Sequence, residues 1–310
     1  MELVRGEYNL RPRHRGCVAT IGNFDGVHLG HQTVLGQLSE KAAEMNVASM
    51  VISFEPYPME FFAAEKAPAR LTRLREKVRA LTRYAVDRML CLRFDAAFAA
   101  MPAQQFIDDV LVAKLDVRYL VVGDDFRFGH DRLGDFAMLR EAGEKHGFKV
   151  VNLHTFMIDN DRVSSTRVRE ALAKGDMASA EQLLGRPYRM CGRVAHGDKR
   201  GRTIGFPTAN IHLHRNNTPV KGVFAVEMFG IDGEPVAGVA NVGTRPTVDG
   251  TRSLLEVHLF DFEQDIYGQY VHVEFVHKLR DECRFDSFDE LRKQIDIDAE
   301  QARAFFAQRL

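Results

Sequence analysis

Two histidines lie three residues apart in a glycine-rich stretch near the N-terminus, GNFDGVHLGH at residues 22–31. An imidazole can donate a hydrogen bond to a phosphoryl oxygen, and glycine lets the backbone approach a ligand closely. A single histidine in such a place is more often structural, but His28 and His31 share one side of a helical turn. This spacing predicts a pair of side chains that handles phosphate.

The residues on either side of this stretch predict a strand-to-helix turn. Residues 18–21 are apolar, which is typical of a buried strand. The residues that follow have the spacing of one helix face: Val34, Leu35, Leu38, Ala42 and Met45. A helix that begins near Gly30 would offer unpaired N–H groups and the positive end of its dipole to an anion.

A second anion-binding helix end is predicted at residues 164–169, with the sequence SSTRVR. The hydroxyls of Ser165 and Thr166 are suited to ordinary helix capping. Arg167 and Arg169, however, fall in the first turn, where the helix dipole opposes a cation at a cost of roughly 0.3–1 kcal/mol each. An anion would remove this conflict, and the arginine fork matches phosphate oxygens. A pyrophosphate leaving group fits this site.

Two further loops contain aromatic residues, and their sequences alone leave their roles open. GDDFRFG at residues 123–129 follows a predicted strand at 119–122, and SFEPYP at residues 53–58 ends another. Each is equally consistent with a surface turn and with a loop that contacts a base or a ring.

The C-terminal half carries another candidate site, GRTIGFPTAN at residues 201–210. Thr208 and Asn210 alternate onto the same face of an extended segment. Their oxygens are hard ligands of the kind that Mg²⁺ accepts while it keeps water and substrate phosphates. A surface turn with solvated polar residues fits this pattern equally well.

Strand-like and helix-like segments alternate up to about residue 184, which predicts a parallel α/β sheet. Beyond the first strand, apolar runs lie at residues 47–54, 88–94, 119–122 and 149–153. Pro102 stands where a helix begins, and an apolar helix face follows it, made of Phe106, Ile107, Val110, Leu111 and Leu115. Ligands of such sheets bind beyond the carboxyl ends of strands, so we expect the loops after Ile21, Phe54 and Val122 to form the site.

From Tyr188 onward, strand follows strand, with turns at Gly197, Gly201, Gly205, Asp232-Gly233 and Asp249-Gly250. This pattern predicts a small antiparallel barrel followed by a helical tail. Capping patterns at Ser287 and Asp298 predict two tail helices, broken near Asp296. We therefore predict two domains, residues 1–184 and 185–310.

Composition restricts the function classes. Lys and Arg number 42 against 43 Asp and Glu, which gives a formal net charge of −1, so no bulk positive field draws the chain to nucleic acid or anionic lipid. No apolar run approaches the roughly 18 residues of a membrane span, and the N-terminus lacks a signal core, so we expect a cytoplasmic protein. The four cysteines are too far apart for a metal or redox pair and are expected to be reduced thiols: Cys17, Cys91, Cys191 and Cys283.

With HxGH, SSTxxR and GDDFRFG, the N-terminal half resembles the nucleotidylyltransferase superfamily, and in particular the adenylyltransferase half of bacterial bifunctional riboflavin kinase/FAD synthetases. GFPTAN at residues 205–210 resembles the ATP and Mg²⁺ signature of riboflavin kinases, so the resemblance covers nearly the whole chain.

For the N-terminal half, the resemblance implies a role for each matching residue. His28 and His31 contact the ATP phosphates; Ser165, Thr166 and Arg169 hold the departing pyrophosphate; Gly22, Phe24 and Asp125 border the nucleotide; Phe126 and Phe128 border the flavin.

For the C-terminal half, the resemblance implies a base, a metal site and a flavin contact. Glu256 acts on the riboflavin 5′-hydroxyl, Thr208 and Asn210 bind Mg²⁺, Lys199 and Arg200 neutralise ATP phosphates, and Arg280 lies near the flavin. Strand alternation separates Glu256 from the apolar face of Leu255 and Val257, so its carboxylate is either half-solvated or functional.

The resemblance implies an enzyme that phosphorylates riboflavin to FMN and adenylylates FMN to FAD, with Mg²⁺ as cofactor and with ATP, riboflavin and FMN as its small-molecule partners. One alternative is an adenylyl- or cytidylyltransferase for another phosphate acceptor, with a non-catalytic barrel. A flavin-binding carrier is another. Product assays with riboflavin, ATP and Mg²⁺ distinguish these functions.

Overall fold

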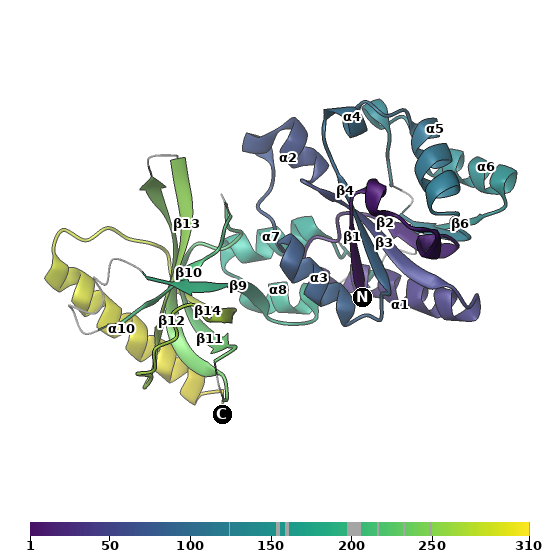
Figure 1. Cartoon of the computed structure of the whole chain (residues 1–310). Coiled ribbons are helices and arrows are strands. Elements are labelled where there is room, and N and C mark those ends of the chain that lie inside the picture. Colours follow the sequence, from purple (N-terminus) through teal and green to yellow (C-terminus); the bar gives the residue numbers. More distant parts are fainter. Residues whose placement is uncertain are drawn as a thin grey trace. The chain divides into compact units, whose positions relative to one another are not determined.

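The chain forms two compact units in the computed structural model (Figure 1). One unit comprises Met1–Pro68 and Thr72–Ser164, and the other comprises Ala69–Leu71 and Ser165–Leu310. The structure describes residues 1–123, 125–152, 156–158, 161–196, 206–215, 217–231, 233–247 and 250–309, and for residues 244–247 and 250–252 it describes the backbone alone.

The first unit is built on a parallel sheet with the strand order β1-β4-β3-β2-β5-β6. The strands are β1 (Glu2–Arg5), β2 (Cys17–Ile21), β3 (Ala48–Glu55), β4 (Arg88–Arg93), β5 (Tyr119–Val122) and β6 (Lys149–Asn152). This confirms the predicted parallel α/β class, with strand ends shifted by one residue at most where the structure describes them. The edge strand β1 was not predicted.

Helices cover both faces of this sheet, as Figure 1 shows. The α-helices of this unit are α1 (Leu29–Glu44), α2 (Pro58–Phe62), α3 (Leu74–Thr82), α4 (Ala96–Ala99), α5 (Ala103–Gln105) and α6 (Phe136–His146). Short 3-10 turns are η1 (Glu7–Asn9), η2 (Pro12–His14), η3 (Ala64–Lys66) and η5 (His130–Arg132). Leu35 of α1 and Leu81 of α3 are buried on one face, and Leu139 of α6 is buried on the other.

The helix predicted after Pro102 is present but is wound more widely than an α-helix. After α5 the chain continues as a π-helix, η4 (Phe106–Lys114), and the N–H of Leu115 donates to the carbonyl of Val110 five residues earlier. The apolar spacing of this segment predicted a helix without distinguishing these two forms.

The three strands whose carboxyl ends we expect to bind the ligand are neighbours in the sheet. β2 has β3 on one side and β5 on the other, and all three run parallel, so the loops after them lie at the same sheet edge. The connection from β2 leads to β3, and β5 joins on the opposite side, which makes this position a topological switch point.

A short hairpin and two helices follow β6. β7 (Met157–Ile158) pairs with β8 (Asp161–Arg162), and neither strand was predicted. Helices α7 (Ser165–Lys174) and α8 (Met177–Leu184) are grouped with the second unit. The domain boundary after residue 184 stays a prediction.

The second unit contains a closed antiparallel barrel with the order β10-β13-β12-β11-β14-β9, which confirms the predicted barrel. Its strands are β9 (Tyr188–Ala195), β10 (Ala209–His212), β11 (Gly222–Phe229), β12 (Val236–Thr247), β13 (Gly250–Leu259) and β14 (Tyr270–Arg280). The predicted turns at Gly197, Gly201 and Gly205 lie outside the described residues.

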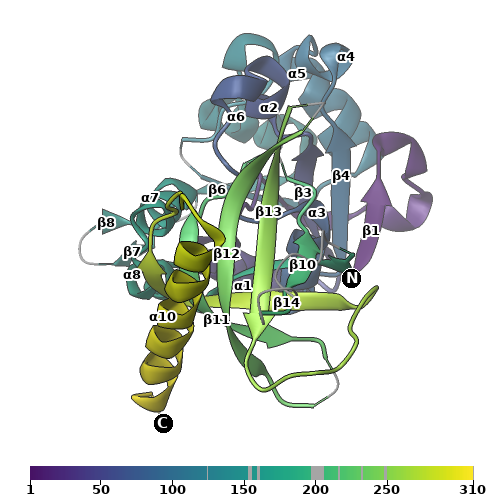
Figure 2. The same ribbon diagram turned by 90° about the vertical axis from the view of Figure 1, so that its left-hand side faces the viewer.

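The helical tail is one continuous helix, α10 (Phe288–Ala307), which lies along the barrel (Figure 2). The predicted break near Asp296 is therefore wrong. Ser287 does cap the helix, because its Oγ accepts from the N–H of Glu290 at 3.2 Å. Asp298 instead lies in the helix interior, where its buried carboxylate accepts hydrogen bonds from Arg280 of β14 and from Gln294.

Two sequence expectations about the chain's environment can be compared with the structure. Within the described part of the chain, no helix has both the length and the apolar character needed to cross a membrane. None of the four cysteines forms a disulfide bond within the described part of the chain, and three of them are buried.

Candidate functional site

The two histidines begin helix α1 and contact each other. His28 is the N-cap residue, and its Nδ1 accepts a hydrogen bond from the backbone N–H of His31 at 3.3 Å. The two imidazole rings stack with centroids 3.7 Å apart, and Phe24 lies 4.8 Å from the His31 ring. The structure thus brings these predicted residues together at the N-terminus of a helix, where free N–H groups favour an anion.

The surroundings of this pair keep one ring uncharged. Burial lowers the pKa of His31 well below 6.5, and the positive charges near it, on His28, Lys77 and Arg162, lower it further. His31 is therefore neutral near pH 7. A neutral His28 carries its proton on Nε2, because its Nδ1 accepts the backbone hydrogen bond, and Nε2–H can donate to a phosphoryl oxygen.

Buried hydrogen bonds hold the loop that precedes the histidines. Oδ1 of Asp25 accepts from the backbone N–H of Thr72 at 2.9 Å, and from the hydroxyls of Thr72 and Tyr57 at 3.2 Å. The N–H of Gly26 donates to the Thr72 hydroxyl at 3.0 Å. At the start of the loop, the N–H of Gly22 donates to the carbonyl of Ile52 and extends the strand pairing. The loop therefore has a defined shape.

Arg162 is a residue that the sequence reasoning missed. Its Nη1 donates to Oδ2 of Asp125 at 2.9 Å, so it connects the loop after β5 with β8. Its charge also acts on His31. The chain beside it passes close to α1, because a Cβ built on Gly30 would lie 3.4 Å from the carbonyl oxygen of Val163. Only its position two residues before the SSTRVR motif marked it in the sequence.

The two phenylalanines assigned to the flavin differ in exposure. Their rings stack with centroids 5.5 Å apart. Phe128 is 8% exposed and belongs to the core of the sheet, where it contacts Phe106, whereas Phe126 is only partly buried. Phe126 therefore has more ring surface available to a ligand.

Ser165 and Thr166 lie in the first turn of α7, which begins where the hydroxyls predicted a helix start, whereas Arg169 is the fifth residue of the helix and not part of its first turn as predicted. These residues belong to the second unit. In that unit, the Nε of Arg169 donates to the carbonyl of Ala69 at 2.7 Å. Their role toward pyrophosphate stays a prediction.

In the barrel, Glu256 lies in register between two asparagines. β13 places Glu256 opposite Asn210 of β10 and opposite Asn241 of β12. Directly opposed residues on adjacent strands have Cβ atoms about 4.5–5.5 Å apart and point to the same face. A carboxylate and two amides therefore share one partly exposed face, while Leu255 and Val257 are buried on the other. Sequence reasoning did not single out Asn241, because its strand partners are visible only in the fold.

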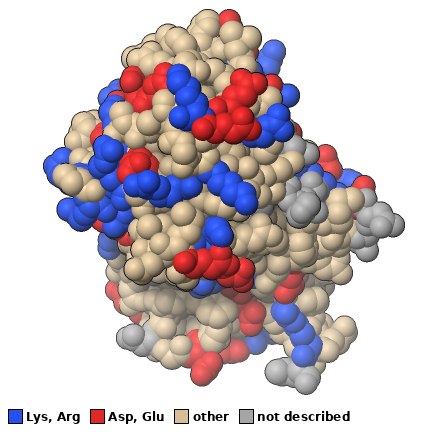
Figure 3. Space-filling view, turned by 90° about the vertical axis from the view of Figure 1, so that its right-hand side faces the viewer, with Lys and Arg blue, Asp and Glu red and all other residues tan. Residues whose placement is uncertain are grey.

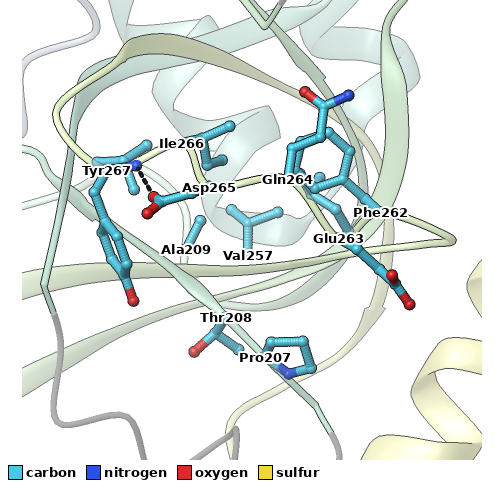
Figure 4. A pocket seen from close by; sticks show the side chains of 12 residues that line it. Pro207, Thr208, Ala209, Val257, Phe262, Glu263, Gln264, Asp265, Ile266 and Tyr267 are labelled. Atoms are coloured by element: carbon cyan, nitrogen blue, oxygen red, sulfur yellow. Dashed lines mark hydrogen bonds between the residues drawn. The ribbon is translucent and has the colours of Figure 1, made fainter.

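A pocket of about 290 Å³ adjoins Thr208 (Figure 4). Val257 and Ala209 form part of its apolar wall, and the segment 262–267 supplies polar groups. This segment is shaped locally, since Asp265 accepts a hydrogen bond from the N–H of Tyr267 at 3.0 Å. The pocket combines an apolar wall with a polar rim, as small-molecule sites commonly do.

The structure places one of the two remaining predicted contacts of the barrel half, the flavin contact of Arg280, and does not describe the other, the phosphate contact of Lys199 and Arg200. The guanidinium of Arg280 is bound to Asp298 through two hydrogen bonds of 2.8 and 2.7 Å. Its Nη1 also donates to the carbonyl of Asp281. Lys199 and Arg200 lie outside the described residues. No cluster of three or more His, Cys, Asp or Glu side chains with metal-binding geometry occurs among the residues that the structure describes.

The surface charge of the molecule is mixed. Basic and acidic side chains both occur across the face drawn in Figure 3, in keeping with the formal net charge of −1. A charged ligand must therefore be recognised by local groups such as those above.

Known proteins similar to this chain cover both units. A family model described as FAD synthetase matches residues 10–167, and one described as riboflavin kinase matches residues 184–306. The bifunctional riboflavin kinase/FMN adenylyltransferase of Haemophilus influenzae is 54% identical over 306 residues, which cover 99% of this chain and 99% of the relative. The enzyme of the same description from Escherichia coli K12 is 55% identical over 99% of this chain and 98% of its own length.

A solved structure also matches nearly the whole chain. A macrolide-efflux protein from Streptococcus pneumoniae is 32% identical and superimposes with a TM-score of 0.81, covering 98% of this chain and 99% of its own.

Proposed function

The chain belongs to the family of bifunctional riboflavin kinase/FMN adenylyltransferases, and on that premise we propose how its residues divide the two reactions. The protein transfers a phosphoryl group from ATP to riboflavin, which gives FMN. It then transfers the adenylyl group of a second ATP to FMN, which gives FAD and pyrophosphate.

Adenylyl transfer takes place at the carboxyl edge of the parallel sheet. The FMN phosphate attacks the α-phosphorus of ATP, and the bond to the departing pyrophosphate breaks. The nucleophile is already an anion, so the site needs no base; it needs positioning and donors for the charge that develops. The observation that carries this assignment is the stacked pair of His28 and His31 at the N-terminus of α1.

The other N-terminal residues support these histidines. Gly22, Phe24 and Asp125 border the nucleotide, since they belong to the loops after β2 and β5 at the switch point. Arg162 holds the Asp125 loop. The remaining assigned contacts are with pyrophosphate, by Ser165, Thr166 and Arg169, and with the flavin, by Phe126 and Phe128.

Riboflavin phosphorylation takes place on the barrel. Glu256 orients the 5′-hydroxyl and accepts its proton as the oxygen attacks the γ-phosphorus of ATP, the bond to the bridging oxygen breaks and ADP leaves. Its position opposite Asn210 supports this role, because the base and the amide then reach the same substrate atoms. The pocket beside Thr208 is suited to the nucleoside part of ATP, Lys199 and Arg200 to its phosphates, and Arg280 to the flavin.

The donor set fits Mg²⁺. Asn210 lies opposite Glu256, Thr208 precedes it by two residues, and both carry hard oxygens; Mg²⁺ typically takes few protein ligands together with substrate phosphates. When bound, the ion neutralises negative charge on the transferred phosphoryl group. Cytoplasmic location is also proposed, and the four free cysteines are consistent with a reducing compartment.

Two full-length variants test the division. Glu256→Gln should stop riboflavin phosphorylation but still convert supplied FMN to FAD, because the adenylylation residues are intact. A His28→Ala/His31→Ala double variant should make FMN from riboflavin and accumulate it. Both products are measured by chromatography of the flavins. Loss of both activities in either folded variant would contradict the two-site assignment.

A further inference from the structure

Lys77 of α3 is one of the largest fully buried side chains of the first unit. Its exposed fraction is 0%, although α3 is a short amphipathic helix with solvent on its other side. Removing an ammonium group from water costs several kcal/mol even after the protein relaxes around it. Such groups are therefore rare away from functional sites, and each one calls for compensating partners.

Two contacts of Lys77 lead toward the loop of residues 22–31. Its Nζ donates to the hydroxyl of Ser53 at 3.1 Å, and Ser53 itself is fully buried near the end of β3. The same Nζ lies 4.5 Å from the centroid of the Tyr57 ring, in cation–π contact. Lys77 thus fixes the segment that leaves β3 at the ligand edge of the sheet.

Tyr57 connects Lys77 with Asp25, the buried carboxylate of the loop. Its hydroxyl donates to Oδ1 of Asp25 at 3.2 Å, while Lys77 lies over its ring. One aromatic side chain therefore contacts a buried cation with its face and a buried anion with its hydroxyl. Asp25 is three residues before His28, and Thr72 holds it from the other side.

We propose that Lys77 is a positioning residue for FMN adenylylation: its buried ammonium acts through Tyr57 and Asp25 on the loop that carries the histidine pair. This inference rests on the proposed assignment of adenylyl transfer to His28 and His31. Lys77 itself touches no reacting atom.

The charge of Lys77 has a second consequence. The positive groups that lower the pKa of His31 come from three places: His28 next to it, Lys77 of α3 and Arg162 of β8. Asp25 is the carboxylate of the same buried network. Neutralising Lys77 removes one of the positive charges, so the pKa of His31 must rise toward its ordinary value of 6.5. Its protonation then begins at a higher pH.

A purely structural role makes a different prediction. If Lys77 only joined α3 to β3, its loss would loosen the unit and lower adenylylation equally at every pH. A positioning role with a charge near the histidines changes the shape of the pH profile as well as its height. The pH profile therefore separates the two roles.

The experiment compares three full-length variants with the unaltered protein. Lys77→Met keeps the length of the side chain and removes its charge, and Lys77→Gln removes the charge but keeps a donor for Ser53. Lys41→Met is the matched control, because Lys41 also lies over a tyrosine ring, Tyr119 at 5.3 Å, but at the surface, where it pairs with Glu44. FMN adenylylation is measured from pH 5 to pH 9, thermal unfolding of each variant reports on folding, and riboflavin phosphorylation in the same samples is the reference activity of the other unit.

Both Lys77 variants should lose adenylylation about 10- to 100-fold at neutral pH, the range expected for a misplaced catalytic group. Their acid limb should move to higher pH, because the pKa of His31 rises when the charge of Lys77 is removed. Riboflavin phosphorylation and the Lys41→Met control should stay unchanged. If Lys77→Met folds poorly, Lys77→Gln decides.

Three outcomes overturn the inference: full adenylylation in both Lys77 variants, a lowered profile with an unmoved acid limb, or an equal loss in both activities. A failure of the proposed assignment is distinguishable from these outcomes, because the His28→Ala/His31→Ala variant would then still convert FMN to FAD.

Discussion

At position 30 the absence of a side chain is what leaves room for the histidine pair. A Cβ built there would lie 3.3 Å from Cε1 and Nδ1 of the His28 ring and 3.4 Å from the carbonyl oxygen of Val163. These contacts are tighter than most, so either the ring or the chain before α7 must shift. The stacking of His28 on His31 therefore depends on a glycine that carries no functional group.

Gly30→Ala should slow FMN adenylylation about tenfold, since a displaced ring loses alignment with the phosphates. Riboflavin phosphorylation should be unchanged. Gly36→Ala is the matched control in the same helix, because nothing lies within 4 Å of its added Cβ. It should leave adenylylation intact and stabilise α1 by about 0.5–1 kcal/mol. Equal activity of the two variants in initial-rate assays would contradict this reasoning.

Residue-level signals also explain what the sequence could and could not predict about the site. The spacing of His28 and His31 predicted their pairing, because three residues along a helix return to the same side. Lys77 and Arg162 were missed because lysine and arginine side chains are usually solvated, whichever element carries them. The buried contact of Lys77 and the ion pair of Arg162 depend on residues far away in the chain, Ser53 and Asp125 respectively.

At the scale of elements, periodicity predicted the helices and strands that have one apolar face. Periodicity did not predict the elements whose presence, ends or winding depend on tertiary contacts. Asp298 has the sequence pattern of a helix cap, yet it remains inside α10 because Arg280 of the barrel binds it through two hydrogen bonds. Four-residue β1 was not predicted because its pairing with β4 is its main support. The winding of η4 was likewise invisible to apolar spacing.

The pair of Arg280 and Asp298 should be a main connection between α10 and the barrel. Asp298→Ala leaves a partly buried guanidinium without its carboxylate and should lower the free energy of unfolding by roughly 2–3 kcal/mol. Asp261→Ala removes a second bidentate ion pair of α10, in which Asp261 binds Arg303. This carboxylate is 79% exposed, so its loss should change the free energy of unfolding little. Urea unfolding of both variants measures the difference, and equal effects would refute it.

Asp176 caps helix α8, and its contribution to the free energy of unfolding should depend on pH. Asp176 accepts hydrogen bonds from the N–H and the hydroxyl of Ser179, and these bonds lower the pKa of the carboxylate below 3.8. A group whose pKa is lower in the folded state stabilises the protein above its unfolded pKa and loses that effect as the pH falls. Asp176→Ala should therefore cost about 1 kcal/mol at pH 7.

That cost should shrink steadily below pH 4, as the carboxylate of the unaltered protein becomes protonated. Denaturant unfolding at pH 7, 5 and 3 measures the change. Asp176→Asn is the control, because an uncharged amide keeps a capping oxygen, and its effect should vary less with pH. A cost for Asp176→Ala that is constant over this range would mean that the charge contributes nothing.

At the scale of the whole molecule, the residues on which the two proposed assignments mainly rest belong to different compact units. The histidine pair is in the first unit, and Glu256 with Asn210 is in the barrel unit. The parallel sheet provides a switch point for nucleotide chemistry, and the barrel provides a row of polar side chains on one face. Two sites of different construction therefore use the same co-substrate, ATP, on successive acceptors.

Because each variant in the functional test disables one site and leaves the other intact, the two should complement each other in solution. A mixture of full-length Glu256→Gln with full-length His28→Ala/His31→Ala should convert riboflavin to FAD, although neither does so alone. FMN formed on one chain must be released and bound by the other, so FAD should form after a lag that shortens as the concentration of the Glu256→Gln chain rises. If the mixture makes no FAD while added FMN is still adenylylated, FMN stays on the chain that made it, and independent action of the two sites is excluded.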